Sequence, residues 1–137
     1  MPESPLAKKM KLKPAARAAV IGAPAGYLTE LKPLPAKVQV FETLEGQFDW
    51  IQLFVKTRAE MESQLRGAVR ALKPESMLWI AFPKGNSKIQ TDLTRDTGWE
   101  ILKTVDLKWV NLVSVNEIWS AFALRPYKPG EAKQEFR

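Results

Sequence analysis

The stretch that decides the fold runs from Phe48 to Lys84 and reads FDWIQLFVKTRAEMESQLRGAVRALKPESMLWIAFPK. Two almost continuous apolar runs, residues 49–55 and 77–82, lie at its two ends. Runs of this kind are typical of strands that are buried on both faces of a parallel sheet. Between the two runs, apolar residues recur with the period of a helix. These residues are Met61, Leu65, Ala68, Val69 and Leu72.

The helix between the two runs has recognisable ends. Thr57 and Glu60 have the spacing of a capping box, and Lys73 and Pro74 are expected to end the helix. Two parallel strands joined by a crossover helix form a βαβ unit, and such units are right-handed almost without exception.

The remaining elements extend this unit on both sides. Residues 17–21 and 38–41 predict two further parallel strands, and residues 89–105 predict a helix that Gly98 divides. The runs 107–115 and 118–124 predict a hairpin, because only two residues separate them. The sequence therefore predicts an α/β fold with a mostly parallel, Rossmann-like sheet, helices on both faces and a C-terminal antiparallel hairpin. The alternative is an α+β domain with a meander.

The amino-acid composition excludes several kinds of chemistry. The chain has 137 residues and is 45% hydrophobic, which fits one soluble domain with a substantial core. It contains neither Cys nor His, which excludes thiolate chemistry, His or Cys zinc sites and Ser-His-Asp catalysis. Any acid–base chemistry must use Asp, Glu, Lys or Tyr. No apolar run reaches the ~18 residues of a membrane span, and no secretory signal is present, so a cytoplasmic protein is expected.

The net charge of +6 is concentrated near the two ends of the chain. Residues 1–17 carry five basic residues and one acidic residue, and residues 125–137 carry four basic and two acidic residues. We therefore expect a flexible basic arm over residues 1–16, a single domain over 17–125 and a polar tail over 126–137. Solvated ends explain this charge, and weak association with nucleic acid is the alternative.

Residues 48–83 also carry a family resemblance. Phe48-Asp49 opens an apolar strand, a helix closes on Ala71-Leu72-Lys73-Pro74, and Leu78-Trp-Ile-Ala-Phe-Pro83 follows. This sequence pattern resembles the second half of a class I methyltransferase. Over almost its full length the chain is also similar to a family of short, uncharacterised bacterial proteins with a reduced methyltransferase-like layout, in which a stretch like residues 83–96 recurs. The second resemblance implies architecture more than activity.

The chain departs from the methyltransferase pattern in its first loop. Pro24 removes one backbone N–H from that loop, and the helix that follows is at most two turns long before Pro33. The layout is also one strand–helix unit short, and no Asn/Asp-Pro-Pro-Tyr motif follows Lys56-Thr57. The absence of Cys excludes cytosine C5 methylation. We therefore predict that S-adenosylmethionine does not bind usefully.

The densest group of polar residues lies in the stretch 83–96, directly after a strand expected to be buried. Ligands of open α/β sheets bind outside the carboxyl ends of the strands, and a Gly-Asn-Ser-Lys loop before a helix suits an anion. The alternative is an ordinary capped helix start with surface ion pairs. The candidate ligand-binding residues of this stretch are Lys84, Ser87, Lys88, Asp92 and Arg95.

Three further candidates follow the first two predicted strands. Gly22 and Gly26 lie at the two ends of a loop. This loop could approach a ligand, or it could be a strained turn between a strand and a helix. Glu42 occupies the place where the methyltransferase resemblance implies an acid for ribose hydroxyls, or is a solvated loop residue. No metal site is predicted.

Three functions remain open on the sequence. The preferred one is a non-catalytic methyltransferase-like module that binds a small anionic or nucleotide-like ligand, or a protein partner, at the carboxyl edge of the sheet. The second is a reduced S-adenosylmethionine-dependent methyltransferase. The third is weak nucleic-acid association through the basic ends. The sequence identifies no cofactor.

Overall fold

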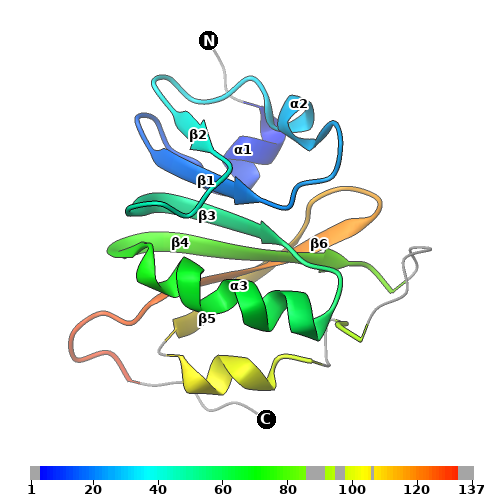
Figure 1. Ribbon diagram of the computed structural model, residues 1–137. Helices are drawn as coiled ribbons and strands as arrows, with labels where there is room; N and C mark the ends of the chain where they lie inside the picture. The colour runs from blue at the N-terminus through cyan, green and yellow to red at the C-terminus, as the bar shows by residue number, and fades with distance from the viewer. Residues whose placement is uncertain (1–3, 86–91, 95–97, 106, 133–137) are drawn as a thin grey trace.

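The computed structural model describes residues 4–85, 92–94, 98–105 and 107–132. Within them a six-stranded sheet has the order β2-β1-β3-β4-β6-β5 (Figure 1). β1, β2, β3 and β4 are mutually parallel, whereas β6 is antiparallel to both β4 and β5. This confirms the predicted fold class. The strands are β1 Arg17–Ile21, β2 Gln39–Phe41, β3 Phe48–Phe54, β4 Leu72–Pro83, β5 Leu107–Ser114 and β6 Trp119–Pro126.

Helices cover both faces of the sheet (Figure 1). α3 (Arg58–Arg70) and the 3-10 helix η1 (Glu100–Thr104) pack on one face, and α1 (Pro5–Lys9) and α2 (Tyr27–Leu31) on the other. Each face has its own core, because successive residues of a strand point to opposite faces. Among the described residues, no helix is long and apolar enough to cross a membrane.

The central βαβ unit forms as its sequence predicts. The Thr57 hydroxyl accepts from the Glu60 backbone N–H at 3.1 Å, and the Glu60 carboxylate accepts from the Lys56 N–H at 3.0 Å. Leu53 and Ile80 are register partners in neighbouring parallel strands, and both are fully buried. The strand after the helix begins earlier than predicted, at Leu72, because this residue pairs with Phe48 instead of ending the helix.

The described part of the N-terminal region differs from the prediction of a mobile basic arm. Ala7, Met10 and Leu12 are at most 1% exposed and belong to the core on the α1 and α2 face. The Ser4 hydroxyl donates to the Leu31 carbonyl at 2.6 Å, and the Trp50 indole N–H donates to the Met10 carbonyl at 2.8 Å. The segment is ordered because its apolar residues, interleaved with lysines, are buried there.

The predicted helix over residues 89–105 is only partly tested. Residues 89–91 and 95–97 lie outside the described residues, and residues 92–94 and 98–99 are not helical. Helical structure is described only in η1. Gly98 has a φ of +100°, and a Cβ there would lie 2.7 Å from Leu93 Cδ2 and 2.9 Å from the Asp92 carbonyl oxygen. A continuous helix cannot pass through this left-handed, closely packed position.

The described part of the C-terminal tail folds back on the hairpin. Arg125 donates to both carboxylate oxygens of Glu131, at 2.9 and 2.8 Å, and Lys108 donates to the same side chain at 2.8 Å. The hydrogen bonds from Arg125, followed by that from Lys108, lower the pKa of Glu131. The ion pairs therefore tie residue 131 to neighbouring positions of β5 and β6.

Candidate functional site

The strand order places a topological switch point between β1 and β3. From β1 the chain moves outward through α2 to β2, then crosses back to β3 on the other side of β1. Ligands of open α/β sheets bind at the carboxyl ends of the strands beside such a point. Gly22 directly follows β1 here and lies against Phe54 at the end of β3. Its φ is +74°, and a Cβ would lie 3.0 Å from the Phe54 carbonyl oxygen.

The loop from Gly22 to Gly26 leads into α2, which has only five residues. Gly26 is the residue before the helix, with a φ of +85°, and a Cβ there would meet nothing within 4 Å. The Tyr27 N–H is already bonded to the Pro24 carbonyl at 3.1 Å. The Gly26 end of the loop is therefore open to an approaching molecule, whereas the Gly22 end is closed against β3.

Aromatic side chains fill the space beneath this loop. The Tyr27 and Phe54 rings meet edge to face at 4.6 Å, and the Phe54 and Trp119 rings meet in the same way at 5.1 Å. The three residues are 0%, 6% and 4% exposed, respectively. The Tyr27 hydroxyl donates to Gln52 Oε1 at 2.5 Å, and burial raises the pKa of Tyr27 above its ordinary value. Tyr27 therefore stays protonated at neutral pH and is not available as a general base.

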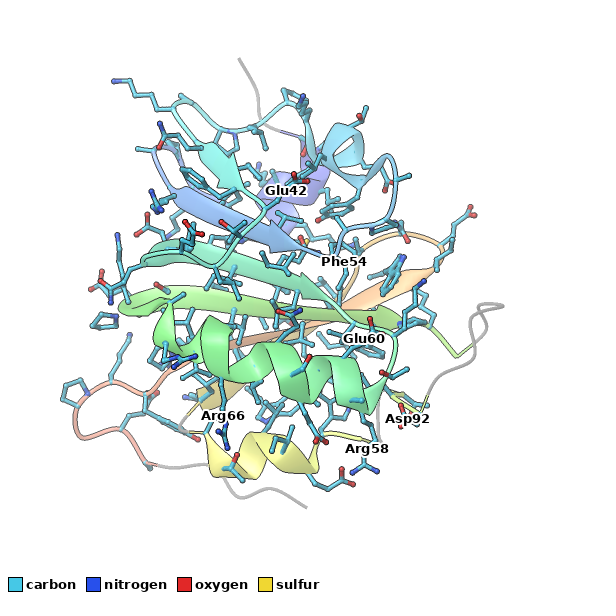
Figure 2. The ribbon with its side chains drawn as sticks, in the orientation of Figure 1. Glu42, Phe54, Arg58, Glu60, Arg66 and Asp92 are labelled. Carbon is cyan, nitrogen blue, oxygen red and sulfur yellow. The ribbon has the colours of Figure 1, made fainter. Side chains whose placement is uncertain are left out.

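Glu42 lies at the end of β2, the neighbour of β1 (Figure 2). Its side chain is exposed and has no hydrogen-bond or ion-pair partner among the described residues. A pocket of about 440 Å³ opens beside it. Leu28, Lys32, Leu34, Val40 and Phe41 complete the lining of that pocket. Glu42 therefore lies at a concave part of the carboxyl edge, and its role toward ribose hydroxyls stays a prediction.

The polar stretch after β4 does not converge on one point where it is described. The Lys84 ammonium donates to the Ser114 hydroxyl at 2.6 Å, so it lies against the hairpin. An Asp92 carboxylate oxygen accepts from the Arg58 backbone N–H at 2.8 Å, which caps the start of α3. Ser87, Lys88 and Arg95 lie outside the described residues. Whether these five residues bind a ligand stays a prediction.

The turn of the β5–β6 hairpin reaches across to other elements at the carboxyl edge. The Asn116 amide donates to the Glu30 carboxylate of α2 at 3.2 Å, and the Lys9 ammonium donates to the Ser114 carbonyl at 2.6 Å. Val115, in the same turn, is buried. These contacts join residues as far apart as 105 positions, which no local sequence pattern could have indicated.

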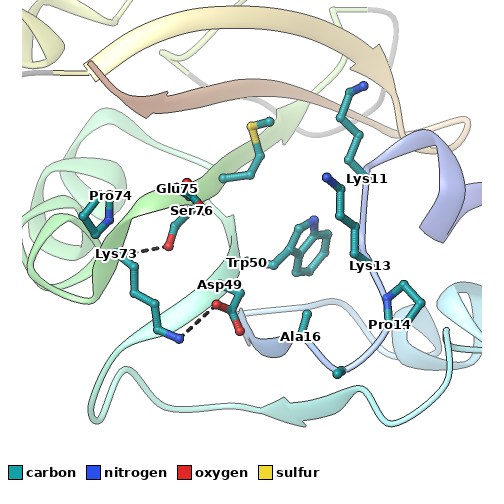
Figure 3. A pocket seen from close by; sticks show the side chains of 12 residues that line it. Lys11, Lys13, Pro14, Ala16, Asp49, Trp50, Lys73, Pro74, Glu75 and Ser76 are labelled. Carbon is teal, nitrogen blue, oxygen red and sulfur yellow. Dashed lines mark hydrogen bonds and ion pairs between the residues drawn. The ribbon is translucent and has the colours of Figure 1, made fainter. Parts of the chain in front are cut away.

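The opposite edge of the sheet contains a larger pocket, of about 680 Å³ (Figure 3). One wall is the segment after α1, and the other is the start of β4. The Asp49 carboxylate accepts from the Arg17 N–H at 2.8 Å and from the Lys73 ammonium at 2.9 Å. These two hydrogen bonds lower the pKa of Asp49. Sequence reasoning missed this pocket because it treated residues 1–16 as a mobile arm.

Among the described residues, no group of three acidic side chains could hold a metal ion. The carboxylates at both edges are either exposed or engaged with basic groups and backbone N–H donors.

No protein-family model and no curated protein matches the sequence. Solved structures do match. The ribosomal protein L11 methylase from Lactobacillus delbrueckii subsp. bulgaricus is 11% identical with a TM-score of 0.56, over 89% of this chain and 76% of that one. The DhpI–SAH complex is 11% identical with a TM-score of 0.59, over 89% and 83%. A SAM-dependent methyltransferase from Aquifex aeolicus is 15% identical with a TM-score of 0.50, over 85% of each chain.

These similarities show the fold. The chain has the Rossmann-like architecture of class I S-adenosylmethionine-dependent methyltransferases, as the resemblance of residues 48–83 implied. The similarity to a family of short bacterial proteins stays a prediction.

Proposed function

We propose that this chain is a reduced S-adenosylmethionine-dependent methyltransferase whose cofactor site lies at the carboxyl ends of β1 and β2. One observation carries the proposal. The Gly22–Gly26 loop and Glu42 follow adjacent parallel strands beside the switch point of a sheet with methyltransferase architecture. This is the place where α/β sheets bind nucleotide-like ligands.

The residues at the ribose end of such a site fit the cofactor. Glu42 is an exposed carboxylate at the mouth of a pocket, and a carboxylate accepts hydrogen bonds from ribose hydroxyls. Gly26 leaves the loop backbone open to close approach, because no atom would meet even an added Cβ within 4 Å. When bound, the cofactor supplies the methyl group. The chain's own residues would bind and orient it.

The second candidate is a non-catalytic module with the same fold, and a specific observation favours it. The rings of Tyr27, Phe54 and Trp119 pack against one another at the carboxyl ends of β1 and β3, and all three residues are buried. Pro24 and the five-residue α2 also leave fewer backbone donors near the ligand than a long helix would. Under this alternative, an anionic ligand binds near Lys84 without S-adenosylmethionine.

Calorimetric titration with S-adenosylmethionine and S-adenosylhomocysteine distinguishes the two candidates. Micromolar binding to the wild type, weakened about tenfold by Glu42→Ala, supports the methyltransferase, because a hydrogen bond to a charged group contributes ~1.5–3 kcal/mol. Glu62→Ala is the matched control. It removes the same charge from an exposed position on α3. No binding at millimolar cofactor would overturn the proposal in favour of the non-catalytic module.

A further inference from the structure

We propose that the pocket at the amino edge of the sheet binds a small phosphorylated molecule of nucleotide size. This site is distinct from the cofactor site proposed above. It lies beyond the amino ends of β1, β3 and β4, whereas Gly22 and Glu42 follow the carboxyl ends of β1 and β2.

The shape and size of the pocket fit such a ligand. Its volume of about 680 Å³ lies within the range of ~300–1,000 Å³ that is usual for small-molecule sites. Trp50 and Met77 contribute apolar lining, and Pro14 and Pro74 lie on opposite walls (Figure 3). The Trp50 indole is held in place by its hydrogen bond to the Met10 carbonyl, at 2.8 Å. Trp50 is itself only 1% exposed, so it supports the floor of the pocket, and the half-buried Met77 offers the apolar surface that a ligand would contact.

Two lysines provide uncompensated positive charge. Lys11 and Lys13 line the pocket, are exposed, and have no hydrogen-bond or ion-pair partner for their ammonium groups among the described residues. Leu12 between them is only 1% exposed, so the core anchors the segment that carries both lysines. An ammonium group is a point-charge partner for phosphate.

The other charges of the lining are largely neutralised. Lys73 and Asp49 form an ion pair of 2.9 Å, and the second Asp49 oxygen accepts from the Arg17 N–H. Glu75 is exposed and is the one acidic residue of the lining that lacks a partner among the described residues. Two free ammonium groups thus face one free carboxylate, and the balance favours an anion.

The segment that forms the lysine wall is held in an uncommon backbone conformation. Lys11 and Ala15 have φ values of 59° and 64°, in the left-handed region that L-residues rarely adopt. Such conformations persist where the surrounding structure fixes them, and they concentrate at ligand sites. Here the buried Leu12 and the hydrogen bond to Met10 fix the segment on both sides of Lys11.

The test uses ADP as the phosphorylated probe and adenosine as its uncharged counterpart, at low salt. We expect sub-millimolar binding of ADP by calorimetry, and adenosine to bind at least about tenfold more weakly. The indole N–H signal of Trp50 in an NMR titration should shift with ADP, because this side chain lines the pocket. Signals of the Gly22–Gly26 loop should not shift, which separates this site from the proposed cofactor site.

Variants of the lysine wall complete the test. The double variant K11A/K13A should weaken ADP binding by about tenfold or more while the melting temperature is kept. Lys8→Ala is the matched control. It removes one exposed lysine of α1 that does not line the pocket, and it should change the affinity less than about twofold.

Several results would overturn the proposal. The first is that ADP does not bind at about 5 mM. The second is that ADP binds without shifting the Trp50 signal. The third is that Lys8→Ala and K11A/K13A lower the affinity for ADP equally. The proposal would also be overturned if a single-stranded RNA bound more tightly than ADP and each lysine substitution, Lys8→Ala included, weakened that binding equally. That result would indicate non-specific electrostatic attraction of nucleic acid.

Discussion

The two edges of the sheet are built in opposite ways. At the carboxyl edge, Tyr27, Phe54 and Trp119 fill the space beside β3, and the hairpin turn reaches across to α2. At the amino edge, a pocket of about 680 Å³ stays open between lysines and an ion pair. The edge at which this architecture ordinarily binds ligands is the more filled one here. Fold alone therefore does not locate the ligand site, and the side chains at each edge must be compared directly.

The largest expected effect is the loss of aromatic packing at the carboxyl edge. Phe54→Ala should lower the free energy of unfolding by about 3–5 kcal/mol, because it removes a ring that contacts both Tyr27 and Trp119. Chemical denaturation measures the change. A loss below ~1 kcal/mol would mean that the rings do not fill this edge and that the two edges are equally open.

Alanine substitutions at the two glycines of the Gly22–Gly26 loop should lower the stability by different amounts. Gly22→Ala should destabilise by about 1–3 kcal/mol, because its φ of +74° disfavours a side chain and its Cβ would lie 3.0 Å from the Phe54 carbonyl oxygen. Gly26→Ala shares the positive φ but meets nothing within 4 Å, so it should cost only about 1 kcal/mol. Thermal denaturation of the pair measures this difference. Equal costs would show that the loop is not clamped against β3.

At the amino edge, Ser76 links two strands. Its hydroxyl donates to the Phe48 carbonyl at 2.6 Å and accepts from the Lys73 N–H at 2.8 Å. Ser76→Ala leaves both groups without this partner and should cost about 1–2 kcal/mol by denaturant titration. Ser63→Ala is a control, because that hydroxyl is exposed on α3. If both variants lose the same stability, Ser76 does not hold the pocket wall.

The smallest expected effect is the contribution of the Asp49 carboxylate to the free energy of unfolding, which depends on pH. Its pKa is lowered in the folded protein, first by the Arg17 N–H and then by Lys73, so the carboxylate stabilises the fold above its unfolded pKa of ~3.9. This contribution is lost as the pH falls through the lower folded pKa. Denaturation curves of wild type and Asp49→Asn should therefore converge once the pH lies below the folded pKa of Asp49, and differ at pH 7 by no more than ~1 kcal/mol, since the pair is partly exposed. A constant difference at all pH values would contradict this.

The parts of the fold that sequence reasoning predicted are those with local, repeating signals. The period of Met61 and Leu65 located α3, and continuous apolar runs located β3 and β4. The N-terminal region was predicted wrongly because its burial depends on distant contacts: four lysines between residues 8 and 13 hid the buried Ala7, Met10 and Leu12. The helix predicted over residues 89–105 is tested only in part, and the described residues 92–94 and 98–99 are not helical.

The candidate site was predicted less completely than the fold. Gly22, Gly26 and Glu42 were placed at one edge because strand ends can be read from the sequence. The aromatic packing beneath them was not predicted, because Tyr27 and Trp119 are 92 positions apart and neither carries a local signal for the contact with Phe54. Lys84 and Asp92 were predicted to bind a ligand, and in the structure they contact Ser114 and the start of α3, contacts that no local pattern indicated.

The packing of the first described residues also constrains the order in which the protein can be completed during synthesis. Ala7, Met10 and Leu12 share a core with Ala121 and Ala123, and Lys9 bonds to the Ser114 carbonyl. Residues 7–12 find their first partners, such as Trp50, soon after they are translated, but their core is complete only when residues more than a hundred positions further along the chain have been added. Contacts of such sequence separation slow folding. The lysine wall of the amino-edge pocket is therefore fixed in stages, first by Trp50 and last by the core that Ala121 and Ala123 complete.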